Sequence, residues 1–371
     1  DIDNHYQCCI YSFIKLIINR KKIKMILITR ILQVSMAVLI FSASSFANEV
    51  NLYSGRHYDS DEKLYSKFTA ETGIKVNVVS GKGKALMQQI ITEGGSSPAD
   101  LFVTVDAGNL WKAEKEGLFE PIDGFDAISS KIRSIVPANL QGPNTTWVAL
   151  AKRARIMYYN PRTVSESELD GLSYEDLANP EWKGRVVIRK SSNMYNQSLV
   201  SSLVANHGVE ATEAWAKGLV SNMARKPEGN DRAQIMAVAN GEADIAVANS
   251  YYIALMLSGK KGAEQQAAAN KVMPYFPSQN GRGTHINVSG IGMLKNGPNK
   301  GNALKFIEFL LSETAQNHIV NNSFEYPLLE GVNPHPLIAQ FGTDFKQDQT
   351  PVSSYGEFNP DAVKLMERAG W

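Results

Sequence analysis

The sequence predicts an α/β fold in which strands and helices alternate in two consecutive series. Short apolar runs that read as buried strands alternate with segments whose apolar residues recur at helical spacing. The connections between them are short, and a second series of the same kind begins after Trp147. Such alternation is typical of a mostly parallel sheet with helices on both faces.

The first series contains three predicted strands and three predicted helices. The strands are expected at residues 50–54, 74–79 and 100–105. The helices are expected between Ser60 and Gly73, and over residues 85–93 and 107–116. Gly73 and Gly117 can end two of these helices, because glycine adopts a left-handed backbone at little cost.

The second series predicts strands at 149–159, 186–188 and 244–249, and helices at 197–206 and 209–220. In open parallel sheets, ligands bind outside the carboxyl ends of the strands. His57 and Tyr58 follow the first strand of the first series, and Tyr251 and Tyr252 follow the strand at 244–249. Two such sheets facing each other would bring these side chains to one cleft.

Residues 1–47 have the composition of an upstream extension and a cleavable signal peptide. A basic cluster precedes an uncharged apolar run at 31–43, and Ser45 and Ala47 supply the small residues of a cleavage site. The apolar run is shorter than the roughly 20 residues of a spanning helix, so a retained membrane anchor is the weaker interpretation. Export to the periplasm is therefore expected. Both cysteines, Cys8 and Cys9, precede the cleavage site, which excludes thiolate ligands from the mature chain.

Charge and motif content exclude several classes of function. Without residues 1–47 the chain keeps 32 basic and 35 acidic residues, a net charge of about −3 without basic tracts. Nucleic acid is not an expected partner, because phosphate binding needs clustered Lys and Arg. The motifs of serine hydrolases, zinc proteases and nucleotide-binding loops are also missing from the sequence. We expect no enzyme, and a monomeric chain.

Five stretches resemble a known family over nearly all of residues 48–371. They are residues 53–58, 97–102, 179–184, 243–252 and 283–290, which read YSGRHY, SPADLF, NPEWKG, ADIAVANSYY and GTHINVSG. In this order and spacing they resemble the ferric-iron-binding periplasmic proteins of ABC importers, within the type II solute-binding fold. The resemblance implies a two-lobed α/β fold with the ligand in the cleft between the lobes, and an inner-membrane ABC permease as partner.

The resemblance also implies how the chain divides into lobes. Residues 48–147 would form the first part of lobe 1 and residues 148–275 the first part of lobe 2. Residues 276–320 would return to lobe 1, and residues 321–371 would add C-terminal helices, mainly on lobe 2. The crossing segments are expected near residues 146–151 and 276–285.

By the same resemblance, Tyr251 and Tyr252 match the paired iron-binding tyrosines. His57 and Tyr58 match the His and Tyr of the first loop, and Tyr195 resembles the additional tyrosine of a tyrosine-rich subgroup. His57 could be a ligand or could bind a ligand from outside the metal's first shell. The chain departs from other members in lacking a convincing counterpart of their lobe-1 carboxylate near residues 81–84. This departure, together with Tyr195 in the anion loop, makes a synergistic anion doubtful.

Phenol oxygen suits ferric iron, because hard trivalent cations prefer hard, negatively charged oxygen donors. A free phenol has a pKa of about 10, but a bound cation expels its proton. Four phenolates, from Tyr58, Tyr195, Tyr251 and Tyr252, would nearly balance Fe³⁺ and would leave one more charge unbalanced around Fe²⁺. Reduction is then a release route. Arg153 and Arg155 could offset phenolate charge from a greater distance.

Other aromatic and ionisable residues have simpler interpretations. Tyr158 and Tyr159 also end a predicted strand, and we expect them to pack. His207 and His285 are expected to be structural or exposed, and Glu325 reads as part of a turn without a chemical role. The main alternative function is a sister protein that binds an oxyanion, a polyamine or a sugar through backbone amides and serines. An enzyme on the same fold is the weaker alternative.

Overall fold

The computed structural model describes residues 48–56, 60–122 and 126–371. Within them, eight strands form one mixed sheet in the order β2-β1-β3-β8-β4-β6-β5, and β7 also pairs with β4. The predicted signal peptide, His57 and Tyr58 lie outside the described residues. None of the described helices is both long enough and apolar enough to cross a membrane.

The first group of strands begins with three that pair in parallel, as the alternation predicts. Strand β1 (Glu49–Ser54) lies between β2 (Lys75–Ser80) and β3 (Leu101–Val105). The helices that connect or follow these strands are α2 (Asp61–Thr72), α3 (Gly83–Glu93) and α4 (Ala107–Lys115). Helix α5 (Asp126–Ile135) packs against α11 (Lys300–Leu310).

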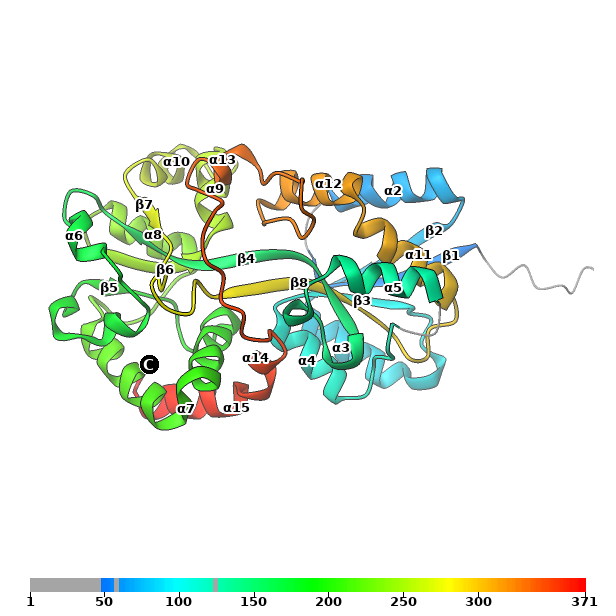
Figure 1. Ribbon diagram of the computed structural model, residues 1–371, viewed down its shortest axis with the longest axis horizontal. Helices are drawn as coiled ribbons and strands as arrows, with labels where there is room; N and C mark the ends of the chain where they lie inside the picture. The colour runs from blue at the N-terminus through cyan, green and yellow to red at the C-terminus, as the bar shows by residue number, and fades with distance from the viewer. Residues whose placement is uncertain (1–47, 57–59, 123–125) are drawn as a thin grey trace, which may run out of the picture. The chain divides into compact units, whose positions relative to one another are not determined.

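Two crossing strands add antiparallel pairs to the sheet. Strand β8 (Ile286–Met293) pairs with β3 on one side and with the first half of β4 (Trp147–Tyr159) on the other. From Arg155 onward β4 pairs with β6 (Ile245–Asn249) and near its end with β7 (Met273–Tyr275). Figure 1 shows β4 running from one strand group to the other. The change of partner occurs between Ala154 and Arg155, beyond the predicted crossing at 146–151.

The second group pairs β6 in parallel with β5 (Val186–Val187), and its apolar side chains pack in one cluster with those of α7 (Met194–Asn222). Gly208 in α7 has φ 80°, which breaks the helix between the two helices predicted at 197–206 and 209–220. The shorter helices of this group are α6 (Glu166–Leu169), α8 (Asp231–Ala239), α9 (Tyr251–Leu257) and α10 (Ala263–Ala269).

The C-terminal residues form short helices that pack on earlier ones. Helix α12 (Glu313–Ser323) contacts α2 and β4, and α13 (Pro336–Ala339) contacts α9. Helix α14 (Ser354–Glu357) contacts α4 and α7, and α15 (Asn359–Arg368) contacts α7.

Two clusters of buried apolar residues hold the helices against the sheet. One extends from the first strand group across β4 to α8 and α9, and includes Phe68 and Phe306, which are fully buried with ring centroids 4.9 Å apart. The other fills the space between α7, α15 and the second strand group around Leu203 and Leu365. Burial of this apolar area is the main favourable contribution to folding. It makes the strand ends rigid supports for the side chains that follow them.

Candidate metal-binding site

The paired tyrosines Tyr251 and Tyr252 begin helix α9 directly after strand β6. The strand is an apolar run that is buried along its whole length. Ser250, between strand and helix, is fixed to β4 on both sides: its N–H donates to the Ala154 carbonyl at 2.8 Å, and its Oγ accepts from the Ala154 N–H at 3.2 Å. The two phenol rings lie against each other, with centroids 4.3 Å apart. The pair is therefore held in the first turn of a helix, where the sequence predicted a strand end.

Tyr195 reaches the same place from the first turn of α7. Asn193 caps this helix, because its side chain accepts a hydrogen bond from the Tyr195 N–H at 3.1 Å. The Tyr251 hydroxyl donates to the Tyr195 hydroxyl at 3.3 Å, although the two residues are 56 positions apart in sequence. Three of the predicted ligands thus meet at one point.

A cavity of about 190 Å³ lies at this meeting point. It is lined by Gly55, Val105, Arg153, Tyr195, Tyr251, Tyr252 and Glu325. Gly55 follows β1 and Val105 ends β3, so both strand groups contribute to the wall. His57 and Tyr58 follow Gly55 closely in sequence but lie outside the described residues.

Two arginines lie near the phenol rings. The guanidinium carbons of Arg153 and Arg189 are 5.6 Å and 5.5 Å from the centroid of the Tyr195 ring. Burial lowers the pKa of Arg153, but the carboxylates of Asp106 and Glu325 outweigh burial, so its pKa is raised overall. Arg153 therefore stays charged and can offset negative charge that develops on the phenols.

The Tyr252 phenol holds its proton in the absence of a cation. Burial raises the pKa of the Tyr252 hydroxyl above its ordinary value, and the nearby Tyr195 and Asp231 raise it further. A cation at the cavity would reverse this preference by stabilising the phenolate. The arrangement can thus exchange phenol protons for a metal ion.

Glu325 was predicted to be part of a turn without a chemical role, and the structure corrects this. Its side chain is only 2% exposed and lines the cavity. Its Oε2 lies 3.4 Å from Arg56 Nη1, its Oε1 lies 3.7 Å from Arg153 Nη1, and Ser289 Oγ donates to Oε1 at 2.7 Å. Its only sequence signal is a carboxylate between Phe324 and Tyr326, which does not reveal arginine partners more than 100 residues away.

A second buried acid, Asp231, contacts the end of the strand that carries the tyrosine pair. It accepts from Arg155 Nη1 at 3.0 Å and from Arg189 Nη1 at 2.5 Å, and its Oδ1 accepts from the Asn249 N–H at 3.2 Å. Asn249 is the last residue of β6 before the Ser250 corner. Arg155 therefore binds Asp231, which supports the strand end before the tyrosine pair, whereas Arg153 lines the cavity.

The histidines expected to be structural do not line this cavity. His285 is 1% exposed, with Nδ1 3.2 Å from Ser202 Oγ and its ring 4.7 Å from that of Tyr355. Burial lowers the pKa of His285 well below its usual range, and the surrounding arginines lower it further. His207 lies 2.8 Å from Glu175 on the surface of α7. Within the described ranges, no group of three or more His, Cys, Asp or Glu residues could hold a metal ion.

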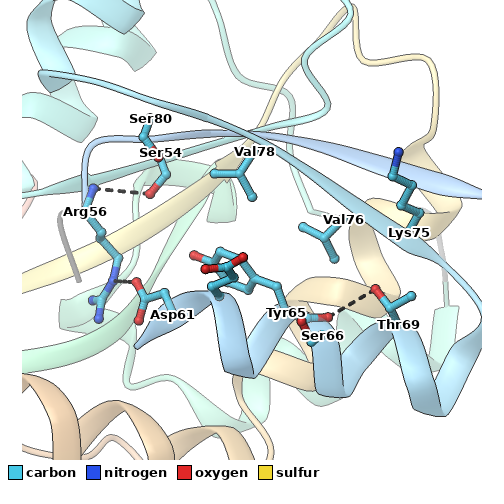
Figure 2. Close-up of a pocket in the computed structure, with 11 residues that line it drawn as sticks. Ser54, Arg56, Asp61, Tyr65, Ser66, Thr69, Lys75, Val76, Val78 and Ser80 are labelled. Carbon is cyan, nitrogen blue, oxygen red and sulfur yellow. Dashed lines mark hydrogen bonds and ion pairs between the residues drawn. The ribbon is translucent and has the colours of Figure 1, made fainter. Parts of the chain in front are cut away.

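A larger hollow of about 920 Å³ lies between α2 and β2 (Figure 2). Arg56 and Asp61 at its inner end bind each other, with Nε and Oδ2 3.1 Å apart, and the Arg56 N–H donates to Ser54 Oγ at 3.2 Å. Its outer wall includes Val76 and Val78 of the edge strand. Arg56 and Asp61 are engaged with each other, and Tyr65 is the one tyrosine in this lining, so the smaller tyrosine cavity is the better candidate metal site.

The chain matches a family model described as bacterial extracellular solute-binding protein over residues 55–317. It is 51% identical to "Iron uptake protein A1" of Synechocystis over 323 residues, which cover 87% of each chain. It is 30% identical to the "Major ferric iron-binding protein" of Neisseria meningitidis over 339 residues, 90% of this chain and 97% of that protein.

A solved structure of a Trichodesmium protein, named IdiA or FutA and described as in complex with iron and citrate ligands, superposes with a TM-score of 0.83. It is 52% identical, and the match covers 87% of this chain and 99% of that one. The mixed sheet, its two strand groups and the crossing strands β4 and β8 agree with this likeness. The chain belongs to the bacterial extracellular solute-binding protein family and has its two-lobed α/β fold.

Proposed function

We propose that this chain is the substrate-binding component of an iron(III) ABC importer. It captures ferric iron through tyrosinate ligands in the periplasm and delivers the ion to an inner-membrane permease. The observation that carries the proposal is the convergence of Tyr195, Tyr251 and Tyr252 on one cavity, with two hydroxyls 3.3 Å apart. The names of the Synechocystis and Neisseria relatives support the choice of iron.

The proposed ligands are Tyr58, Tyr195, Tyr251 and Tyr252, with His57 as a fifth ligand or a hydrogen-bonding neighbour. Four phenolates carry four negative charges against the three of Fe³⁺, and Arg153 supplies a buried positive charge beside them. This balance makes a synergistic anion unnecessary. Fe²⁺ would leave a further negative charge in a cavity of lowered dielectric, so reduction favours release.

The proposed lobes follow the two strand groups. Residues 48–147 and 276–320 form lobe 1, and residues 148–275 form lobe 2. Residues 321–371 lie mainly on lobe 2, which the contacts of α13 with α9 and of α15 with α7 support. The lobes close over the ion by a hinge motion at the crossing segments, and the permease recognises the closed form. Catalysis is not part of this function.

The test is to load the purified mature chain with ferric iron from a weak chelator and record its visible spectrum. Phenolate-to-iron charge transfer should colour the wild type, and the double variant Tyr251→Phe/Tyr252→Phe should stay colourless. Tyr159→Phe, which changes a tyrosine outside the cavity lining, is the matched control and should keep the colour. Colour of equal intensity in the double variant would exclude this site.

The alternative, a solute-binding protein for an oxyanion, polyamine or sugar, predicts another result. Its binding would depend on Ser54, Ser191, Ser192 and Ser250 instead of the phenols. Ser191 Oγ already donates its hydrogen to the carbonyl of Trp371, and Ser250 Oγ accepts from the Ala154 N–H. The engaged Ser191 donor favours iron over such a solute. Calorimetric binding of such a solute to iron-free protein, together with no iron-dependent colour, would support the alternative.

A further inference from the structure

Asp106 has a backbone conformation that is rare for any residue other than glycine. It lies between β3 and α4 with φ 81° and ψ 123°, and only 1% of it is exposed. Residues that have a Cβ seldom adopt these backbone angles, because they are sterically strained. Such a strained conformation persists only where surrounding contacts hold it. The contacts of this carboxylate are therefore informative.

The carboxylate of Asp106 joins four elements of the fold. Oδ1 accepts from the Gly108 N–H of α4 at 2.9 Å and from Ser198 Oγ of α7 at 2.7 Å. Oδ2 accepts from Asn287 Nδ2 of β8 at 3.0 Å and lies 3.7 Å from Arg153 Nη2 of β4. One side chain thus connects the end of β3 to both crossing strands and to the helix that carries Tyr195.

Helical geometry places the Ser198–Asp106 hydrogen bond close to the phenol cluster, which is formed by Tyr195, Tyr251 and Tyr252. Ser198 follows Tyr195 by three residues, so both side chains lie on the same side of the first turns of α7. The start of α7 also lies close to the start of α4, because a Cβ on Gly108 would be 3.2 Å from Met194 Sδ and 3.8 Å from Ser198 Oγ. There is little room for the first turn of α7 to shift while the bond to Asp106 is intact.

The same carboxylate also acts on the charged neighbour of the cavity. The Arg153 guanidinium lies 3.7 Å from an oxygen of Asp106 and from one of Glu325, and its carbon is 5.6 Å from the centroid of the Tyr195 ring. Asp106 is therefore bound to the helix that holds one phenol and to the cation that faces it. No other described residue is hydrogen-bonded to Ser198 Oγ.

We propose that Asp106 is a positioning residue for the metal site, which sets the place of Tyr195 through Ser198 and the place of Arg153 through its second oxygen. This inference rests on the proposed function, because it concerns the same cavity. Asp106 does not line the cavity and is not itself a ligand. Its strained backbone directs the carboxylate toward α7.

The test compares Ser198→Ala with Ser201→Ala in the full mature chain. Both serines are fully buried in α7, but Ser201 Oγ has no hydrogen-bond partner among the described residues. Ser198→Ala should lower ferric affinity about tenfold in competition with a chelator, the effect expected of one hydrogen bond to a charged group. Its charge-transfer band should weaken and move to longer wavelength, because iron with a poorer phenolate set accepts charge more easily. Ser201→Ala should match the wild type in both.

Asp106→Gly provides the second arm, because glycine adopts the backbone of this position without strain while the carboxylate is lost. Its affinity should fall by more than that of Ser198→Ala. In the Asp106→Gly background, Ser198→Ala should have no further effect, because the two residues act as one unit. A role in stability alone would lower the melting temperature of the iron-free protein without moving the band.

The outcomes separate this inference from the function on which it rests. If wild type binds iron with colour and Ser198→Ala has the affinity and band of Ser201→Ala, the positioning role is wrong and the proposed function stands. The positioning role would also be refuted if Ser198→Ala lowered ferric affinity equally in the wild-type and Asp106→Gly backgrounds. If wild type binds no ferric iron, both proposals fail.

Discussion

Two adjacent tyrosine pairs, Tyr158-Tyr159 and Tyr251-Tyr252, lie at the ends of neighbouring antiparallel strands and have different environments. The Tyr158 hydroxyl is fully buried and donates to the carbonyls of Asn249 and Ser250, each at 3.1 Å. Tyr251 and Tyr252 both line a cavity instead. Tyr158 thus holds the corner from which the second pair begins.

The difference comes from backbone geometry and not from residue type. Successive side chains of a strand point to opposite faces, so Tyr158 and Tyr159 diverge. Successive side chains in the first turn of a helix are only about 100° apart, so Tyr251 and Tyr252 can face one cavity. A tyrosine pair is therefore a candidate chelate where a strand gives way to a helix. Within a strand the same pair is a packing element.

The largest expected effect is the loss of ferric affinity when a tyrosine of the Tyr251-Tyr252 pair is replaced. Tyr252→Phe removes a proposed anionic ligand, so ferric affinity should fall at least about hundredfold, the upper range for residues that only support ligands. Tyr159→Phe should change it less than about twofold, because this residue is outside the cavity lining. Competition with a chelator of known iron affinity measures both. Similar losses in the two variants would remove the distinction between the pairs.

A second comparison uses pH. Burial raises the pKa of Tyr252, so its phenol is protonated near neutral pH and must lose the proton when iron binds. Affinity should therefore rise with pH and fall on acidification, by about tenfold per pH unit for each proton released. Tyr252→Phe should release one proton fewer per iron than wild type, and Tyr158→Phe should release the same number.

Titration with iron in weakly buffered solution, followed by a pH indicator, counts these protons. The proton balance of the chelator is measured alone and subtracted. An unchanged count in Tyr252→Phe would show that this phenol does not ionise on binding.

The smallest expected effect is on the free energy of unfolding, and here the buried Tyr158 of the first pair is the residue that matters. Tyr158→Phe leaves two carbonyl groups without their buried donor and should lower the free energy of unfolding of the iron-free protein by about 1–2 kcal/mol. Tyr159→Phe, at the half-buried end of the strand, should stay within about 0.5 kcal/mol of wild type. Urea unfolding followed by circular dichroism gives both values. A larger loss for Tyr159→Phe would contradict the assigned contacts.

Much of the fold could be predicted from local pattern. The strand predicted at 149–159 is observed at Trp147–Tyr159, and the break between two predicted helices falls at Gly208. Periodicity reports which residues are apolar and how they are spaced, and this decides the local element. It does not report partners, so the antiparallel pairing of β4 and β8 needed the tertiary structure.

The phenol cluster was partly predictable, because Tyr251 and Tyr252 stand directly after an apolar strand and the family resemblance points to Tyr195. Asp231 and Glu325 were not. An acid that opens a helix or lies two residues before a proline usually faces water, but these two are buried against arginines from distant segments. Such pairs leave no periodic signal in the sequence.

Arg153 and Arg155 stand two residues apart on β4, so both project from the same side of one strand. The change of pairing partner falls between Ala154 and Arg155. Arg153 consequently binds acids associated with one strand group, and Arg155 binds the acid that supports the other. In the proposed function, an ion bound at the tyrosine cavity would change the electric field at both guanidinium groups. One short stretch of β4 thus places a buried cation beside each strand group.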